Sequence, residues 1–226
     1  MSWLLRGFLC STVILTSHLQ ALATPQIRSN SEANQALKVT VLFFDFVSLP
    51  ENIQIKAQAR VTEIYNTAGI ELKWAPCSTG EGQLERYPGC NGFKDSTHVF
   101  LHVLPHARKG MKGEAGGEAI LGARTINVFW DLAQSEAQRN AVPLPDMMGL
   151  IIAHEIGHLL LGPDSHSAAG IMTARWKSRD LVAICQGGLT FTRQESERIQ
   201  AEVRKRQAQQ ALVASAPARV EGADER

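Results

Sequence analysis

Three histidines and a glutamate fall within the segment HEIGHLLLGPDSH, residues 154–166. His154 and His158 are four residues apart, so on a helix both imidazoles lie on one face and can bind one metal ion. Glu155 directly follows the first histidine and can reach a water molecule held by the same ion. The spacing predicts a zinc site with its own general base, an arrangement suited to hydrolysis.

The segment that carries this motif, residues 146–162, is apolar nearly all round, which predicts a buried helix. Asp146 after Pro145 is the expected N-cap, and Gly162 is the expected stop signal. The alternative to a metal site is a pair of ordinary hydrogen-bonded core histidines. Two histidines and a glutamate are costly to bury without a purpose, so the metal site is favoured.

A catalytic zinc ion commonly has three protein ligands and one open position, so one ligand must come from outside this helix. Gly162 allows a sharp turn, after which Asp164 and His166 can both come back towards the ion. Met172, in the segment GIMTARW, suits a tight turn beneath the ligands.

Over residues 146–176 the sequence resembles the metzincin zinc peptidases, whose pattern is HExxHxxGxxH followed by a methionine turn. It is similar to bacterial secreted proteins that carry HEIGHLLLG…HS…GIM…W. The resemblance extends more loosely to the whole mature domain, in the order of its strands and helices. It implies one catalytic Zn²⁺ held by His154, His158 and a third ligand, with Met172 as a structural floor.

The chain departs from the metzincin pattern after the second histidine. Leu161 stands where the family has glycine, and Gly162 comes one residue later. Asp164 stands at the family's third-ligand position, and some metzincins use aspartate there. His166 lies two residues further on. We favour His166, because zinc commonly binds imidazole and a longer loop can absorb the extra residues, with Asp164 as the alternative.

The resemblance also implies where a substrate binds. Strand 119–129 would form the rim of the cleft and pair with an extended peptide. Arg175 would help to shape the pocket, and Ala174 replaces a tyrosine that assists the transition state in some metzincins. Oxyanion support would then come from the ion or from elsewhere. The residues implied near the substrate are Leu121, Gly122, Ala123 and Trp176, the last of which could equally be a core residue.

Two other sets of residues could bind a metal in principle. Glu195 or Glu197 could be a distant third ligand, but both belong to a charged segment typical of a solvated helix face. His98, His102 and His106 recur every four residues in a segment that favours a strand. Along a strand the first two would lie about 13 Å apart, too far to share one ion.

The rest of the chain alternates between strand and helix patterns. Strands are predicted at 37–47, 70–75, 97–104 and 119–132, the last with a bend at Gly122, and a loop at 105–118. Helices are predicted at 51–69, 178–185 and 192–210. This order predicts an α+β fold, and with the resemblance a metzincin-like domain: a mixed twisted sheet, a backing helix, an active-site helix and a helical C-terminus.

The first 23 residues predict an export signal, with Arg6 before an apolar stretch and small residues at Ala21 and Ala23. A secreted or periplasmic location follows. We expect a flexible leader at 24–36, the catalytic domain at 37–210 and a disordered tail at 211–226.

Loss of Arg6 lowers the count of Lys and Arg from 23 to 22, which equals the 22 Asp and Glu. A neutral chain argues against nucleic acid and against anionic membranes, because both attract a surplus of basic residues. No stable membrane insertion is expected after signal cleavage. The expected partner is a peptide or protein substrate.

An exported protein meets an oxidising compartment, where disulfides form. Cys77 and Cys90 flank the loop CSTGEGQLERYPGC and are expected to pair. Cys185, beside apolar residues, is expected to be a buried core residue.

Together these patterns predict a secreted zinc-dependent endopeptidase in which Glu155 is the general base. One alternative is a zinc amidohydrolase that acts on a non-peptide amide. The other is a non-catalytic, zinc-stabilised binding module. Glu155 argues against that module, because a purely structural site fills the fourth position with protein and needs no base.

Overall fold

The computed structural model describes residues 35–77, 90, 95–108, 116–177, 180–182 and 188–215. The predicted signal peptide, almost all of the leader, Cys185 and most of the predicted helix 178–185 lie outside the described residues. Residues 36–226 form one compact unit, and the fold described below belongs to it.

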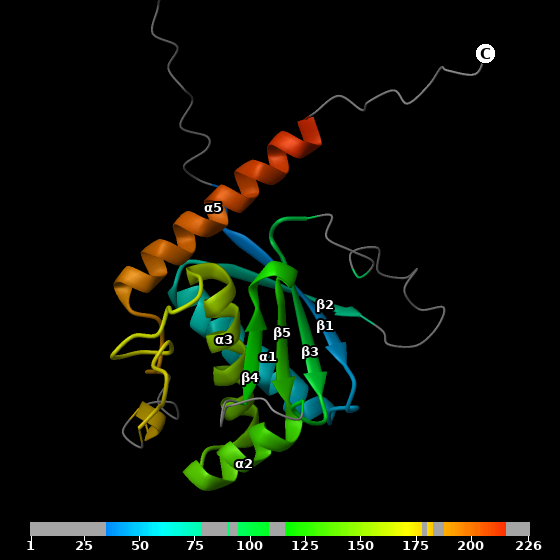
Figure 1. The fold of residues 1–226 in the computed structure, drawn as a ribbon, viewed down its shortest axis with the longest axis vertical. Coiled ribbons are helices and arrows are strands. Elements are labelled where there is room, and N and C mark those ends of the chain that lie inside the picture. The colour runs from blue at the N-terminus through cyan, green and yellow to red at the C-terminus, as the bar shows by residue number, and fades with distance from the viewer. Residues whose placement is uncertain are drawn as a thin grey trace, which may run out of the picture. The chain divides into compact units, whose positions relative to one another are not determined.

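A five-stranded mixed sheet forms the centre of the domain (Figure 1). Its strands are β1 (Lys38–Asp45), β2 (Glu71–Cys77), β3 (His98–Leu104), β4 (Gly117–Ile120) and β5 (Thr125–Phe129). Their order is β2-β1-β3-β5-β4, and all neighbours are parallel except β4, which pairs antiparallel with β5 at the edge. The predicted mixed sheet is confirmed.

Helices cover one face of this sheet and enclose the main core. They are α1 (Glu51–Thr67), α2 (Trp130–Asn140), α3 (Leu144–Leu161) and α5 (Arg193–Ser215). Because side chains alternate along a strand, β1 points Val39, Val41 and Phe43 into that core. The predicted backing helix is α1, whose Val61 and Ile64 are buried against the same residues. The strand and helix patterns therefore converge on this core, which is the larger of two buried apolar clusters among the described residues.

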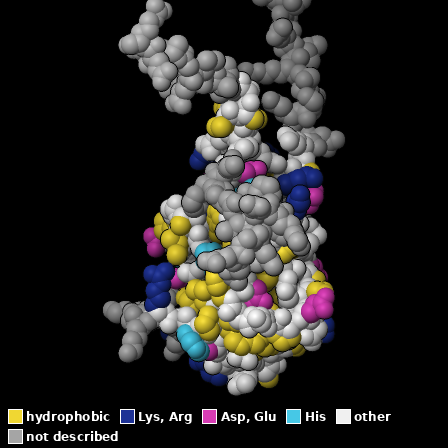
Figure 2. All heavy atoms as spheres, turned by 90° about the vertical axis from the view of Figure 1, so that its right-hand side faces the viewer, with side chains coloured by type: hydrophobic (Ala, Val, Ile, Leu, Met, Phe, Trp, Pro, Cys, Tyr) yellow, Lys and Arg dark blue, Asp and Glu magenta, His cyan; other side chains and the backbone are white. Residues whose placement is uncertain are grey.

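The other face of the sheet carries an aromatic group. The Phe44 ring meets the ring edge of His102 at a centroid distance of 5.1 Å, and Phe46 does so at 5.7 Å. Phe46 is 48% exposed. In Figure 2 hydrophobic side chains lie at the surface over the lower part of the face shown, with charged side chains among them and at the edges.

The apolar helix α3 lies at the heart of the domain. By length and composition it could cross a membrane, but 72% of it is buried inside the domain, as expected of a core helix. The Tyr65 hydroxyl of α1 donates to the carbonyl oxygen of Ala153 at 3.1 Å. Near the C-terminus of α3, Arg198 and Arg206 of α5 donate to the carbonyl oxygens of Leu161 and Leu159. These contacts satisfy carbonyls that a helix end leaves without partners.

The predicted strand 119–132 is confirmed only at residues 119–120, which belong to β4, and at 125–129, which form β5. Residues Leu121–Ala123 form a 3₁₀ turn, and Arg124 follows in the left-handed region at φ 47°. The chain therefore reverses between β4 and β5 instead of bending. After β5 it enters helix α2 at Trp130, where no helix was predicted. The apolar residues continue through Phe129 and Trp130, so the sequence gives no sign of this boundary. The spacing of apolar residues does not distinguish a buried strand from a buried helix in a short segment.

Two predicted helix ends also differ. Helix α3 begins two residues before Asp146, with Pro143 at the N-cap and Pro145 in the first turn. Proline is tolerated there because the first backbone N–H groups of a helix have no intrahelical partner. Helix α5 continues to Ser215, beyond the predicted end at residue 210.

The predicted disulfide between Cys77 and Cys90 is present, with a Cα–Cα distance of 5.8 Å. Replacing Cys77 with Ser should lower the free energy of unfolding by about 3 kcal/mol, because the open loop regains chain entropy in the unfolded state. Urea denaturation of the full chain measures this. Wild-type protein unfolded under reducing conditions is the control and should match the variant; an unchanged urea midpoint would contradict the prediction.

Candidate metal centre

Three imidazoles meet at the C-terminal half of α3. Nitrogen atoms of His154, His158 and His166 all lie within 4.8 Å of one another. The helix supplies the first two from one face, and Gly162 (φ 96°) turns the chain so that His166 comes back to them. Asp164 is exposed in a left-handed conformation (φ 57°) and is not in the cluster. The structure therefore places His166, and not Asp164, beside the helical pair.

Hydrogen bonds orient the two helical histidines. His154 Nδ1 lies 2.9 Å from the carbonyl oxygen of Ile171, and a carbonyl only accepts, so this Nδ1 carries the proton. His158 Nδ1 lies 2.9 Å from Ser165 Oγ. The Nε2 atoms of the two rings then face each other at 3.0 Å. Histidine ligands of metals are held in this way by the nitrogen that does not bind the metal.

Burial favours the neutral forms of His154 and His158. Burial, with a smaller effect of His154, lowers the pKa of His158 to about 4, and burial also lowers the pKa of His154. A neutral imidazole with a bare nitrogen is the form that binds metals. Two bare nitrogens facing each other, with a third imidazole alongside, repel unless a cation or a proton lies between them. The three residues fit a zinc ion with a fourth position left for solvent.

Glu155 lies between α3 and the edge strand, and only 6% of it is exposed. A Cβ atom on Gly117 of β4 would come within 2.9 Å of Glu155 Cγ, so glycine lets the strand lie directly against this side chain. Burial, together with a smaller effect of the nearby Glu118 carboxylate, raises the pKa of Glu155 to about 8. A carboxylate with a pKa near neutrality is a strong proton acceptor, as a general base must be.

The methionine turn lies beneath the helix. Met172 is fully buried, and a Cβ atom on Gly157 of α3 would come within 2.5 Å of its sulfur. The backbone of the turn is tied on both sides: Ser167 N donates to Met172 O, and Ile171 N donates to Thr190 O, each at 2.9 Å. Met172 therefore supports the helix turn that carries the histidines.

Replacing Gly157 with Ala should destabilise the protein by about 1–3 kcal/mol, because the added methyl group overpacks against Met172. Helix propensity alone predicts the opposite sign, a gain of about 1 kcal/mol. Chemical denaturation gives the difference in unfolding free energy. In a Met172→Ala background the same change should cost much less, and an equal cost in both backgrounds would rule out this contact as the cause.

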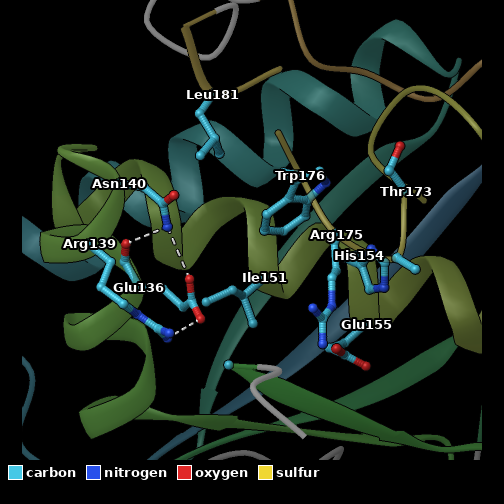
Figure 3. A pocket seen from close by; sticks show the side chains of 12 residues that line it. Glu136, Arg139, Asn140, Ile151, His154, Glu155, Thr173, Arg175, Trp176 and Leu181 are labelled. Atoms are coloured by element: carbon cyan, nitrogen blue, oxygen red, sulfur yellow. Dashed lines mark hydrogen bonds and ion pairs between the residues drawn. The ribbon is translucent and has the colours of Figure 1, made fainter. Parts of the chain in front are cut away.

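A pocket of about 410 Å³ opens beside the centre, with His154 and Glu155 in its wall. Trp176, predicted near the substrate, lines it; its Nε1 donates to Ile171 O at 3.1 Å, and its ring meets the His154 ring edge-on. Arg175 also lines the pocket (Figure 3). Ala174 is a further lining residue. The predicted residues Leu121, Gly122 and Ala123 do not, because they belong to the 3₁₀ turn. The edge strand next to Glu155 is β4.

Sequence reasoning did not single out the polar residues that α2 and the loop after α3 contribute to this region, nor Thr173 in the pocket lining. Glu136, Arg139 and Asn140 line the pocket from α2, and Ser165 holds His158. The sequence indicates α2 only through Ala133 and Ala137, two apolar residues at helical spacing that are the buried residues of this helix. Ser165 offered no signal, since its contact depends on the loop conformation.

The other candidate ligands have structural roles. Glu195 is buried, against expectation, and accepts a hydrogen bond from Thr192 N at 2.7 Å as a cap of α5. Glu197 pairs with Arg193 on the surface. His98, His102 and His106 lie on or just after β3, as the strand prediction requires. Within the described part of the chain, His154, His158 and His166 are the one cluster of three or more possible ligands.

No protein-family model and no curated protein matches this chain. Two similar solved structures are an archaemetzincin from Methanopyrus kandleri and a zinc-dependent peptidase from Methanocorpusculum labreanum. The first is 16% identical with a TM-score of 0.46, and the match covers 75% of this chain and 97% of that one. The second is 15% identical with a TM-score of 0.48, and the match covers 71% and 99%. Likeness at this level does not carry either protein's activity over to this chain.

Proposed function

We propose that this protein is a zinc-dependent endopeptidase. One observation carries the proposal: the Nε2 atoms of His154 and His158 converge beside His166, next to a buried carboxylate and a pocket. A structural zinc site would close the fourth position with a protein ligand. Here the described residues contribute three imidazoles, and Glu155 is adjacent in the pocket wall.

His154, His158 and His166 would hold the ion. When bound, zinc supplies a Lewis acid that polarises the substrate carbonyl and lowers the pKa of water. Ile171 O and Ser165 keep the two helical rings in place through their Nδ1 atoms, so that the Nε2 atoms stay directed at one point.

Glu155 acts as the general base. Its carboxylate takes the proton of the attacking water and then passes that proton to the leaving amine. The burial that raises its pKa makes it a better acceptor, while a cation nearby would lower that pKa and keep the side chain ionised before the reaction. Because Ala174 stands two residues after Met172, no tyrosine assists from that position.

The location of the protein is part of the proposal. An export signal at residues 1–23 would deliver it to the periplasm or the medium, where the disulfide between Cys77 and Cys90 is stable. Cell fractionation with N-terminal sequencing of the mature chain tests this. A mature protein that keeps residues 1–23 in the cytoplasm would contradict it.

Metal content and proteolysis, measured on one preparation, test the activity. We expect about one zinc per chain, cleavage of casein or of a peptide library, loss of cleavage with a chelator, and recovery on adding zinc. Cell-wall fragments with non-peptide amides, assayed in parallel, distinguish the amidohydrolase. Zinc binding without hydrolysis of either substrate would favour the binding module instead.

A further inference from the structure

The pocket beside the metal centre ends at three polar side chains of α2. Glu136, Arg139 and Asn140 are spaced three and four residues apart and so share one face of the helix. Figure 3 shows Ile151 between this group and Glu155. Ile151, Trp176 and Leu181 are the large apolar side chains of the wall, and Arg175 lies at the end near Glu155 (Figure 3). A ligand lying in the pocket therefore meets an apolar passage and then a polar end.

The hydrogen bonds of this polar end favour an anion. The two carboxylate oxygens of Glu136 already accept from Arg139 Nη2 and, at 3.0 Å, from Asn140 Nδ2. Arg139 uses one of its three nitrogens on partners among the described residues, and 55% of its side chain is exposed, against 22% for Glu136. An arriving carboxylate can bind the remaining N–H groups of Arg139 without breaking a bond. An arriving ammonium or guanidinium group meets a carboxylate that is less exposed and already has a donor on each oxygen. It would also lie in a pocket whose lining carries the two cations Arg139 and Arg175.

We propose that Arg139 is a specificity-determining residue that selects peptides with an acidic side chain next to the bond to be cut. The proposal rests on the peptidase function above. Arginine and carboxylate form charge-assisted hydrogen bonds, often two in parallel. The negative end of the α2 dipole opposes an anion, but it is equivalent to about half a charge and the guanidinium carries a full one.

The length of the passage favours glutamate over aspartate. Ile151 precedes His154 by three residues, which corresponds to a rise of about 4.5 Å along α3. A side chain that starts near the histidines must pass Ile151 before it reaches Arg139. Glutamate has one methylene group more than aspartate for that distance.

Binding to a non-cleaving form of the full chain tests the proposal without relying on turnover. The Glu155→Gln protein is titrated with blocked tetrapeptides Ala-Ala-Xaa-Ala, where Xaa is Glu, Gln or Lys, so that the peptide carries at most one charge. We expect the Glu peptide to bind about tenfold more tightly than the Gln peptide, and the Lys peptide more weakly still. Adding Arg139→Glu should reverse the order of the Glu and Lys peptides.

Arg193→Glu is the matched control, since Arg193 is also exposed, also pairs with a glutamate on its own helix, and lies outside the pocket lining. It should leave the order unchanged. Equal affinities for the three peptides, a preference for Lys, or no measurable binding would overturn the proposal. Cleavage by the wild-type chain without an acidic preference would also overturn it and leave the peptidase function standing. If the Glu peptide binds through Arg139 but no peptide is cleaved, the peptidase function is overturned and the acidic preference of the pocket stands.

Discussion

Replacing Glu155 with Gln is expected to leave zinc content near one ion per chain while turnover falls by about 10²–10⁴-fold. Glutamine has nearly the same shape, so the packing of this side chain against Gly117 and β4 is retained. It lacks a carboxylate that can take a proton from water. The three histidines that would hold the ion are untouched, which separates the proposed base from the metal site. Zinc analysis and kcat on one peptide substrate measure both quantities.

Glu197→Gln provides the matched control for this experiment. The replacement is the same, glutamate to glutamine, but Glu197 lies on an exposed helix face, where it pairs with Arg193. It should alter neither zinc content nor turnover. A Glu155→Gln protein with wild-type turnover would remove Glu155 from the role of base, and one without zinc would show that Glu155 is needed to assemble the site.

Replacing His166 with Ala is expected to weaken zinc binding by more than 100-fold. Loss of a residue that merely orients a ligand typically costs about 10–100-fold in metal affinity, so loss of the ligand itself should cost more. Asp164→Ala should bind zinc like the wild type, because Asp164 lies outside the histidine cluster. Competition titration with a chromophoric chelator gives the affinities.

The pair of variants decides between the two possible third ligands. If Asp164→Ala loses zinc and His166→Ala retains it, the assignment is reversed and the chain follows the aspartate form of the metzincin pattern. Both residues are exposed, so neither replacement should disturb the core, and circular dichroism of each variant checks that it is folded.

Two features around the pocket depend on contacts between distant parts of the chain and could not be predicted from the sequence: the turn at residues 121–123 and helix α2. Leu121 to Ala123 were placed on a strand, yet they form the turn between β4 and β5, because β4 pairs with β5 at the sheet edge. Helix α2 was missed altogether, and with it the polar end at Arg139. Its mean composition is polar and its buried residues are the small Ala133 and Ala137, so its apolar stripe is weak. Only packing against the rest of the domain reveals which side of it faces the pocket.

The sequence by itself determined the parts of the site that lie within one regular element. His154, Glu155 and His158 have their relative directions from helix geometry, which is the same wherever the helix packs. The alternation in β1 and β3 likewise determined which side chains enter the core. Tertiary structure alone decided that His166 and not Asp164 joins the helical pair, and that Ser165 and Ile171 orient the rings. A loop has no intrinsic geometry of its own, so its side chains take their directions from contacts with residues distant in the chain.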